Sequence, residues 1–323
     1  MNLPHERSAW NGARFDPQSD LGHYESYFQR ANHPGRPLAF WIRYTVFSPR
    51  GRPQDTIGQL WAIYFDGEAG KIAAVKQDFL LQECKFSSQG LAVRIGAAQL
   101  DDASLQGAAS SKGQSIGWAL DYAGDQPPVL LLPRSSYARG FPRAKALVGL
   151  PLAKYNGRLE VNGATIPVED WVGSQNHNWG SRHTDTYAWG QVVGFDNAPE
   201  AFLECATARL KLGPLWTPAM TVVCLRFDGH DYRLNSPRQM FRAKGGWKDF
   251  DWQFDSAQAG VRIRGRMHAA PEQFVSLTYY NPPGSTHTCL NSKLAACEVT
   301  LERAGKPPVT LTTRHRAAFE ILT

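Results

Sequence analysis

Two histidines, an aspartate, a tyrosine and two tryptophans lie within the sixteen residues 176–191 of this sequence. Imidazole, carboxyl and phenol groups can transfer protons near neutral pH, and indole rings can stack on apolar or cationic ligands. An ordinary strand does not need this mixture, because aliphatic residues fill its buried face and Lys, Glu or Thr its exposed face. We therefore interpret the segment as a candidate site for acid–base chemistry.

Odd and even positions of this segment carry different kinds of side chain. If residues 182–193 form a strand, successive side chains point to opposite faces. One face then carries the reactive and aromatic residues His183, Asp185, Tyr187, Trp189 and Gln191. The other face carries the small residues Thr184, Thr186, Ala188 and Gly190. We expect the reactive face to line the lumen of a β-barrel; the alternative is a solvated exterior face.

His177 precedes this strand and lies two residues before Trp179. A neutral imidazole there could relay a proton or orient an acid, whereas a purely structural histidine would bond a backbone carbonyl. His177, His183 and Asp185 are also the ligand types of zinc and non-haem iron, but their spacing matches no recognised metal motif. We therefore expect no metal and no other cofactor.

Glu204 is the best candidate for an acid, because it stands in the otherwise apolar run 202–208. If its side chain enters a cavity beside Phe202, loss of solvent favours the protonated carboxyl, which can donate a proton near neutral pH. Asp185 is the second candidate acid. The alternative for Glu204 is a salt bridge, for instance to Arg209 or Arg182.

Short segments rich in β-branched and aromatic residues recur along the chain, separated by Gly, Pro, Asn and Asp. We expect strands at residues 38–47, 60–65, 91–95, 115–122, 158–161, 187–195, 201–210, 220–227, 247–254, 260–269, 274–281 and 297–302. The best helical candidate, residues 135–147, is interrupted by Pro142. The predicted fold class is all-β.

The length of 323 residues exceeds the usual size of a single hydrophobic core. Two antiparallel barrels or sandwiches are favoured over one open sheet, because long sheet edges promote aggregation. A boundary near the candidate site divides the chain evenly. We predict one domain at residues 1–180 and a second at residues 181–323.

Composition excludes several classes of function. The formal charge of +6 is spread along the chain and accompanies no nucleic-acid-binding motif, although it allows weak attraction to anionic membrane surfaces. No stretch approaches the roughly 20 apolar residues of a membrane-spanning helix, and the first residues do not form a signal peptide, so we expect a cytoplasmic protein. The five cysteines include no CxxC pair, and their odd number leaves one unpaired in any disulfide scheme. We therefore expect buried thiols rather than a disulfide scaffold.

Three common enzyme signatures are either absent from the sequence or lack the structural context that they require. The G-x-S-x-G match at residues 113–117 lies in a chain without the strand–helix alternation that a nucleophile elbow needs, which weakens the case for nucleophilic hydrolysis. There is no Walker sequence and no G-x-G-x-x-G opening a helix, so nucleotide chemistry is not expected.

A longer pattern contains both candidate regions: His-x-Trp-Gly at residues 177–180, an aromatic strand after it, and an aromatic-x-acid strand at residues 202–204. This pattern resembles the carotenoid hydratase family, also called hydroxyneurosporene synthase-like, and its AttH relatives. The resemblance extends to residues 27–32 near the start and to residues 283–284 and 289–291 near the end. It therefore covers most of the chain.

The resemblance implies two lipocalin-like barrels with an active site in an apolar cavity. Enzymes of this family add water across a terminal isoprenoid double bond without a cofactor, and related double-lipocalin proteins include tocopherol cyclase-like enzymes and pericyclases. The histidine and tryptophan of the family motif match His177 and Trp179. The family's Tyr-x-Asp pair falls on Phe202 and Glu204, so this chain keeps the acid and loses the phenol. That departure leaves the reaction itself open.

Residue chemistry agrees with such a reaction. Protonation of a trisubstituted alkene creates a tertiary carbocation, which requires one partly desolvated acid and aromatic faces that stabilise the cation. Glu204 or Asp185 can supply the proton, and His177 can orient the acid or accept the proton that water gives up. The candidate aromatic faces are Trp179, Tyr187, Trp189 and Phe202.

Two classes of function stay open from the sequence. One is a cofactor-independent hydratase, cyclase or isomerase acting on a hydrophobic, isoprenoid-like molecule, with His183, Arg209 and Trp216 as further substrate contacts. Residues 211–218 are marked by Gly and Pro and could cover a cavity mouth. The other is a lipocalin-like carrier that binds a hydrophobic small molecule without catalysis. A Glu204 side chain that points to solvent would favour the carrier.

Overall fold

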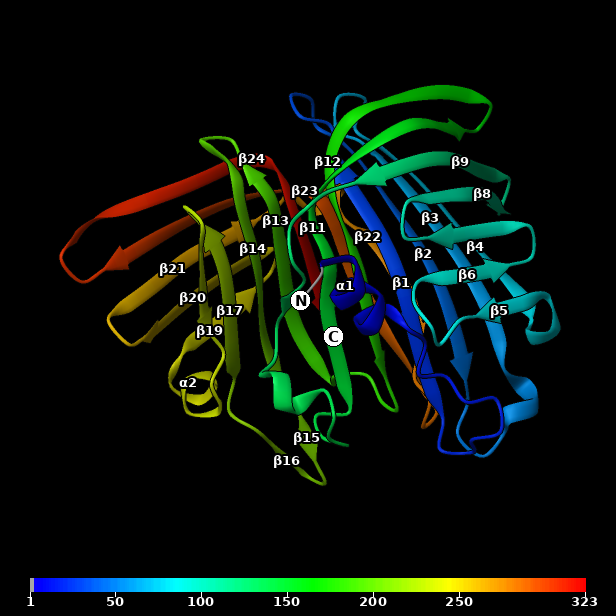
Figure 1. Ribbon diagram of the computed structural model, residues 1–323, viewed down its shortest axis with the longest axis horizontal. Coiled ribbons are helices and arrows are strands. Elements are labelled where there is room, and N and C mark those ends of the chain that lie inside the picture. Colours follow the sequence, from blue (N-terminus) through cyan, green and yellow to red (C-terminus); the bar gives the residue numbers. More distant parts are fainter. Residues whose placement is uncertain (1–2) are drawn as a thin grey trace. The chain divides into compact units, whose positions relative to one another are not determined.

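The computed structural model describes residues 3–323, with side chains from Arg7 onward, and it is built almost entirely of antiparallel strands (Figure 1). The all-β class predicted from the sequence is confirmed. Residues 3–323 contain two α-helices, α1 (Leu3–Asn11) and α2 (Pro237–Arg242), and four 3-10 helices, Pro53–Asp55, Leu81–Glu83, Arg134–Ser136 and Pro271–Gln273. Among the described residues, no helix combines the length and the apolar character needed to cross a membrane.

The chain forms two compact units. The first contains the described residues up to 129 together with residues 143–183 and 280–286, and the second contains residues 130–142, 184–279 and 287–323. Each unit is therefore assembled from separate stretches of sequence, whereas the sequence predicted two continuous domains that meet at residues 180 and 181. Segment 130–142 belongs to the second unit and segment 280–286 to the first.

The first sheet has twelve strands among the described residues, ordered β4-β3-β2-β1-β12-β11-β9-β8-β7-β6-β5, with β10 paired to β11. Its strands are β1 (His23–Asn32), β2 (Leu38–Ser48), β3 (Ile57–Asp66), β4 (Lys71–Leu80), β5 (Cys84–Phe86), β6 (Ala92–Ile95), β7 (Ala98–Asp101), β8 (Ser104–Ser111), β9 (Gln114–Ala123), β10 (Val129–Leu130), β11 (Ala144–Val161) and β12 (Ala164–Gly180).

The first sheet curls back on itself around a hydrophobic core. Backbone N–H groups of β4 donate to side chains near the β8–β9 turn, with Ala74 N 2.9 Å from Gln114 Oε1. Inside, the indole nitrogen of Trp118 donates to the hydroxyl of Tyr44 at 2.8 Å, so a buried polar pair is satisfied within the core.

The second sheet has ten strands among the described residues, ordered β18-β17-β14-β13-β24-β23-β21-β20-β19, with β22 paired to β23. Its strands are β13 (Thr186–Phe195), β14 (Ala198–Arg209), β17 (Met220–Phe227), β18 (His230–Leu234), β19 (Lys244–Lys248), β20 (Asp251–Gln258), β21 (Val261–His268), β22 (Val275–Tyr280), β23 (Thr286–Arg303) and β24 (Lys306–Leu322). A separate small hairpin consists of β15 (Lys211–Leu212) and β16 (Leu215–Trp216).

The second sheet also encloses its own core, and a glycine lets its far edge approach the opposite strands. A Cβ at Gly245 on β19 would lie 2.2 Å from Thr207 Oγ1 on β14 and 2.3 Å from Thr221 Oγ1 on β17. Those two hydroxyls are hydrogen-bonded at 2.9 Å, and the indole nitrogen of the buried Trp252 donates to Thr207 at 3.0 Å. Only a residue without a side chain fits over this polar pair.

Three predicted elements are wrong in detail. The strand predicted from residue 182 begins only at Thr186, because residues 181–185 form a polar connection after β12. Residues 247–254 contain a turn between β19 and β20 rather than one strand. The helical candidate at residues 135–147 has only one 3-10 turn before β11 begins at Ala144, since Pro142 cannot continue a helix.

Candidate functional site

The first unit brings a group of polar side chains together on β1 and β12. The register of these neighbouring strands places Glu25 opposite Trp179 and Tyr27 opposite His177. His23 lies two residues before Glu25 and therefore on the same face. Tyr27 is part of the hydrophobic core, so this group lies on the core-facing side of the first sheet.

Glu25 is the centre of this group and is fully buried. Its Oε1 accepts from His177 Nε2 at 2.8 Å and from the Tyr27 hydroxyl at 3.3 Å, and its Oε2 lies 3.0 Å from His23 Nε2. The backbone N–H of Arg14 reaches both carboxylate oxygens, at 3.0 and 2.9 Å. Burial raises the pKa of Glu25, but the hydrogen bonds and charges of His177 and His23 outweigh it and hold the pKa below its ordinary value.

His177 is fully buried between aromatic rings. Its ring is stacked on Tyr27 with centroids 4.2 Å apart, and the Trp179 ring lies 4.7 Å away. Nε2 faces Glu25, and Nδ1 lies 3.2 Å from the carbonyl oxygen of Trp10. Burial lowers the pKa of His177, although the hydrogen bond to Glu25 opposes this shift.

This arrangement determines which chemistry the group in the first unit can perform. The hydrogen bonds and charges of the two histidines stabilise the ionised form of the Glu25 carboxyl. Burial also raises the pKa of Tyr27, so its phenol stays protonated. Glu25 therefore orients His177 and can support proton relay, but it is poorly suited to donate a proton itself.

The second unit contains the acid predicted from the sequence. Glu204 on β14 is 2% exposed, so its side chain does not point to solvent. A solvent-facing Glu204 is what a simple carrier would show. Its Oε1 accepts a hydrogen bond of 2.8 Å from Trp189 Nε1, and its Oε2 accepts one of 2.7 Å from Gln191 Nε2. Both donors lie on β13, where Gln191 is the register partner of Glu204. Two oriented N–H donors on one strand thus hold the Glu204 carboxyl.

The face of β13 that carries Trp189 and Gln191 does not line the core of its barrel, so the predicted lumen position is wrong. The small residues Ala188 and Val192 face the core instead. Gly190 faces the core as well. A Cβ there would lie 2.6 Å from the end of the Met267 side chain, because large core side chains already fill the space over the core-facing side of β13. The reactive residues consequently lie on the opposite side of the sheet, where Trp189 and Gln191 are also buried.

A buried charge pair lies on the sheet face that carries Trp189 and Gln191. The fully buried Lys293 on β23 places Nζ 2.8 Å from Glu320 Oε1 on β24 and 2.6 Å from Asn291 Oδ1. Asn291 also donates to Glu320 at 2.7 Å. The Lys293 ammonium lies 5.6 Å from the centre of the Trp189 ring. Trp189 therefore contacts both Glu204 and the Lys293–Glu320 pair.

Phe202 and Tyr187 complete this surface. Phe202 is fully buried two residues before Glu204 and lies on the same face of β14. The Tyr187 phenol hydrogen-bonds the thiol of Cys289, and burial raises the pKa of Tyr187 well above its ordinary value. Cys289 Sγ also lies 3.8 Å from Glu320 Oε2. A phenol is thus present on this face, although not at the position that the family motif predicts.

The remaining predicted site residues have other neighbours. His183 is stacked on Tyr24 with ring centroids 3.8 Å apart. Asp185 Oδ2 accepts the backbone N–H of Lys211 at 2.9 Å, which fixes the base of the β15–β16 hairpin. The Arg209 guanidinium lies 5.4 Å from the ring centre of Trp216 in the same hairpin. Contact of these residues with a substrate stays a prediction.

His177 and Trp179 belong to the first unit, whereas Glu204 belongs to the second. The carboxylate that contacts His177 is Glu25, and the residues that contact the Glu204 carboxyl include Trp189 and Gln191. Joint action of His177, Trp179 and Glu204 on one substrate therefore stays a prediction.

Sequence reasoning missed several members of both groups: His23, Glu25 and Tyr27 in the first unit, and Lys293, Asn291 and Glu320 in the second. A signal was present for Glu320, which stands in the apolar run 317–322 just as Glu204 stands in its own. Alternation of His23, Glu25 and Tyr27 along one strand is the corresponding signal in the first unit.

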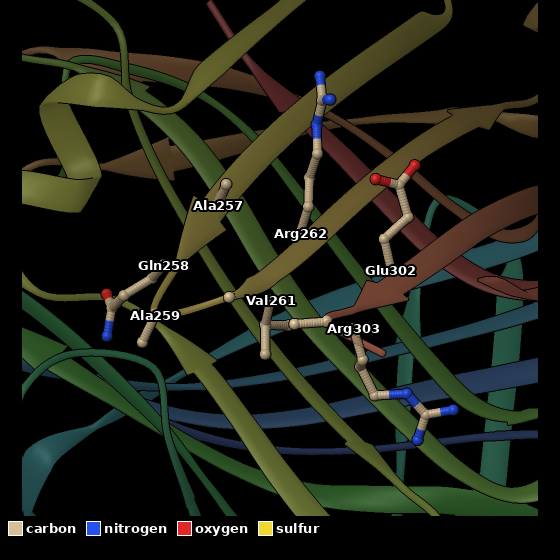
Figure 2. A pocket seen from close by; sticks show the side chains of 9 residues that line it. Ala257, Gln258, Ala259, Val261, Arg262, Glu302 and Arg303 are labelled. Atoms are coloured by element: carbon tan, nitrogen blue, oxygen red, sulfur yellow. The ribbon is translucent and has the colours of Figure 1, made fainter. Parts of the chain in front are cut away.

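Two surface hollows are lined by residues outside these groups. One hollow of about 480 Å³ is located at the β20–β21 turn, where Figure 2 shows Arg262 and Glu302 pointing to one side and Arg303 to another. None of the predicted site residues lines it. Within residues 3–323, no three His, Cys, Asp or Glu side chains are grouped so that they could hold a metal ion.

No family model matches the chain. Among curated relatives, uncharacterized proteins from two strains of Mycobacterium tuberculosis are each 28% identical over 310 residues, which is 95% of this chain and 87% of theirs. These relatives support a shared architecture along nearly the whole length.

Solved structures share the fold. A protein described as AttH from Nitrosomonas europaea has a TM-score of 0.61 at 14% identity, covering 100% of this chain and 96% of its own. Kievitone hydratase from Nectria haematococca has a TM-score of 0.60 at 11% identity, covering 100% and 92%. CghA with bound Sch210972 has a TM-score of 0.54 at 11% identity, covering 100% and 97%. The double lipocalin-like fold expected from the sequence resemblance is confirmed.

Proposed function

We propose that this protein is a cofactor-independent hydratase or cyclase that protonates a carbon–carbon double bond of a hydrophobic, isoprenoid-like substrate, with Glu204 as the acid. The observation that carries the proposal is the buried Glu204 carboxyl, held by Trp189 at 2.8 Å and Gln191 at 2.7 Å. The fold supports the reaction class, since a hydratase and a protein with a bound small molecule share it. Fold likeness alone does not establish chemistry.

The proposed reaction begins with proton transfer. The O–H bond of the Glu204 carboxyl breaks as a C–H bond forms on the alkene, which leaves a tertiary carbocation and a carboxylate. The N–H donors of Trp189 and Gln191 stabilise that carboxylate more than the neutral acid, so they favour the charge-separated transition state. The aromatic ring of Phe202, on the same sheet face, is placed to stabilise the cation.

The cation then has two outcomes that return the enzyme to its starting state. Water can add to it and give a proton back to the Glu204 carboxylate, which completes a hydration. Alternatively, another double bond of the substrate can attack, and loss of a neighbouring proton to the carboxylate completes a cyclisation or an isomerisation. Both outcomes balance without an electron donor or acceptor.

We assign His177 and Trp179 a positioning role in the first unit. His177 is fully buried, and its ring nitrogens face Glu25 and the Trp10 carbonyl. The hydrogen bonds and charges of His177 and His23 hold the pKa of Glu25 below its ordinary value, which suits a fixed negative charge better than a proton donor. The acid of the proposal is therefore Glu204 rather than Glu25.

An isoprenoid-like substrate partitions into lipid, so the proposal includes contact between this protein and a membrane surface. The positive formal charge of +6 agrees with attraction to anionic lipids. The substrate would then be collected from the bilayer rather than from free solution.

Turnover in oxygen-18 water tests the proposal. Native mass spectrometry of freshly purified protein identifies a co-purifying lipid, and squalene and lycopene serve as defined acyclic isoprenoid probes. We expect a product that carries the label for hydration, or an unlabelled isomer of the probe for cyclisation. Glu200→Gln is the matched control for Glu204→Gln, because Glu200 is an exposed carboxylate on the same strand. A co-purified ligand that is bound and never converted would instead show a carrier.

A further inference from the structure

The β15–β16 hairpin of the second unit exposes three large apolar side chains. Leu212 is 60% exposed, Leu215 is 71% exposed and Trp216 is 43% exposed. Figure 1 shows the hairpin extending past the ends of β14 and β17, the strands that flank it in the chain. Adjacent exposed apolar residues of this size mark an interaction surface more often than chance.

The hairpin is held in one shape. Leu212 and Leu215 are register partners across a two-residue turn, and Gly213 at its first position has φ +61°, which a glycine adopts without strain. At the base, the Leu210 N–H donates to Thr217 Oγ1 at 2.9 Å, and the Thr217 N–H donates to the Leu210 carbonyl at 2.9 Å. Docking through this tip would therefore require little additional ordering.

Two exposed cations flank the apolar tip. The Arg209 guanidinium lies 5.4 Å from the Trp216 ring centre, and Lys211 Nζ lies 6.0 Å from it. This combination is typical of side chains that bind at a bilayer interface: exposed apolar residues, an indole ring and neighbouring cations. The same unit contains the 64% exposed Phe141 and the exposed Arg139 two residues before it.

We propose that this hairpin docks the protein on an anionic lipid bilayer, with Leu212, Leu215 and Trp216 entering the interface. Charge complementarity selects this partner, because Arg209 and Lys211 would contact lipid phosphates. A symmetric contact with a second copy would instead bring like cations together. The proposal specifies the membrane contact of the proposed function, but it rests on the exposure and charge of the hairpin and not on the reaction.

Sedimentation with phosphatidylglycerol–phosphatidylcholine vesicles, compared with phosphatidylcholine alone, tests the docking surface without any substrate. We expect binding to the anionic vesicles that weakens with added salt. The double variant Leu212→Asp/Leu215→Asp should lose at least about tenfold in partition coefficient, since two apolar contacts are removed. Arg209→Gln/Lys211→Gln should lose roughly tenfold or more and flatten the salt dependence.

Leu80→Asp is the matched control, because Leu80 is also 60% exposed but lies in the first unit; it should bind like the unsubstituted protein. Wild-type binding by the Leu212→Asp/Leu215→Asp variant, with an unchanged circular dichroism spectrum, would overturn the proposal. So would analytical ultracentrifugation that shows the hairpin variants changing from dimer to monomer, which would identify a second copy as the occupant. Vesicle binding and turnover are separate readouts, so failure of either proposal is seen independently.

Discussion

The indole nitrogen of Trp189 donates a hydrogen bond of 2.8 Å to Oε1 of Glu204, and both residues lie on the sheet face that is turned away from the core of their own barrel. Ala188 and Gly190 of the same strand face the core, so strand alternation places the Trp189 indole on the opposite face. The pairing of β13 with β14 then brings Trp189 within reach of Glu204. Strand alternation and core packing together orient the candidate acid.

Trp189→Phe should lower kcat because it keeps an aromatic ring and removes the N–H donor to Glu204. Loss of one donor to a developing carboxylate costs about 10²–10³ in rate. Turnover of the identified substrate is the measurement, with its dissociation constant determined in parallel. Trp247→Phe is the control, since Trp247 on β19 packs against the hydrophobic core, whereas Glu204 lies on the face turned away from that core. Equal kcat for Trp189→Phe and wild type would remove this bond from the mechanism.

Acid should destabilise the first unit through Glu25 and His177. The pKa of Glu25 is lowered from its ordinary 4.5, so its contribution to stability is present above that pH and lost as the pH falls. The pKa of His177 is lowered from 6.5, so the unfolded chain binds its proton first and stability also falls below that pH. Urea unfolding between pH 7 and acid should show a free energy of unfolding that decreases in both windows.

Glu25→Gln isolates the carboxylate in that profile. Removing a charged acceptor of several hydrogen bonds should cost about 1.5–3 kcal/mol at neutral pH. The decrease in stability below the ordinary pKa of glutamate should become shallower than in the wild type. A variant with the wild-type slope in that window would show that Glu25 does not carry the acid sensitivity.

Gly245→Ala should destabilise the second unit, whereas the neighbouring Gly246→Ala should not. A Cβ at Gly245 would collide with the hydroxyls of Thr207 and Thr221, while a Cβ at Gly246 has nothing within 4 Å. Overpacking of this kind costs about 1–3 kcal/mol, and exposed substitutions stay within about 0.5 kcal/mol. Thermal unfolding of the two variants makes the comparison, and equal melting temperatures would contradict the close approach of β19 to β14.

Lys293→Met should be more destabilising alone than together with Glu320→Gln. The single substitution leaves the Glu320 carboxylate buried without its cation, which costs about 3–5 kcal/mol for a buried pair. The second substitution removes that uncompensated charge and recovers part of the loss. A double-mutant cycle by chemical unfolding measures the coupling between them, and additive effects would show that the 2.8 Å pair contributes no coupling.

The fold class and the burial of Glu204 could be predicted from local sequence, whereas the partners of the candidate site residues could not. A carboxylate in an apolar strand is a local signal, and it identified Glu204. The same signal at Glu320 was missed because residues 306–322 were not recognised as a strand. Glu25 and His177 are 152 residues apart in sequence, so their contact depends on the pairing of β1 with β12. Alternation separates two faces of a strand but does not say which face is the core, and that is why the lumen prediction for Trp189 and Gln191 was wrong.

Proton transfer from Glu204 is measured most directly by deuterium incorporation. In D₂O the wild type should place one solvent deuterium on the alkene carbon of the converted isoprenoid. Glu204→Gln should lower the rate of that incorporation by about 10²–10⁴, while Glu200→Gln keeps the wild-type rate. Incorporation by Glu204→Gln at the wild-type rate, in protein with an unchanged melting temperature, would contradict the assignment of Glu204 as the acid.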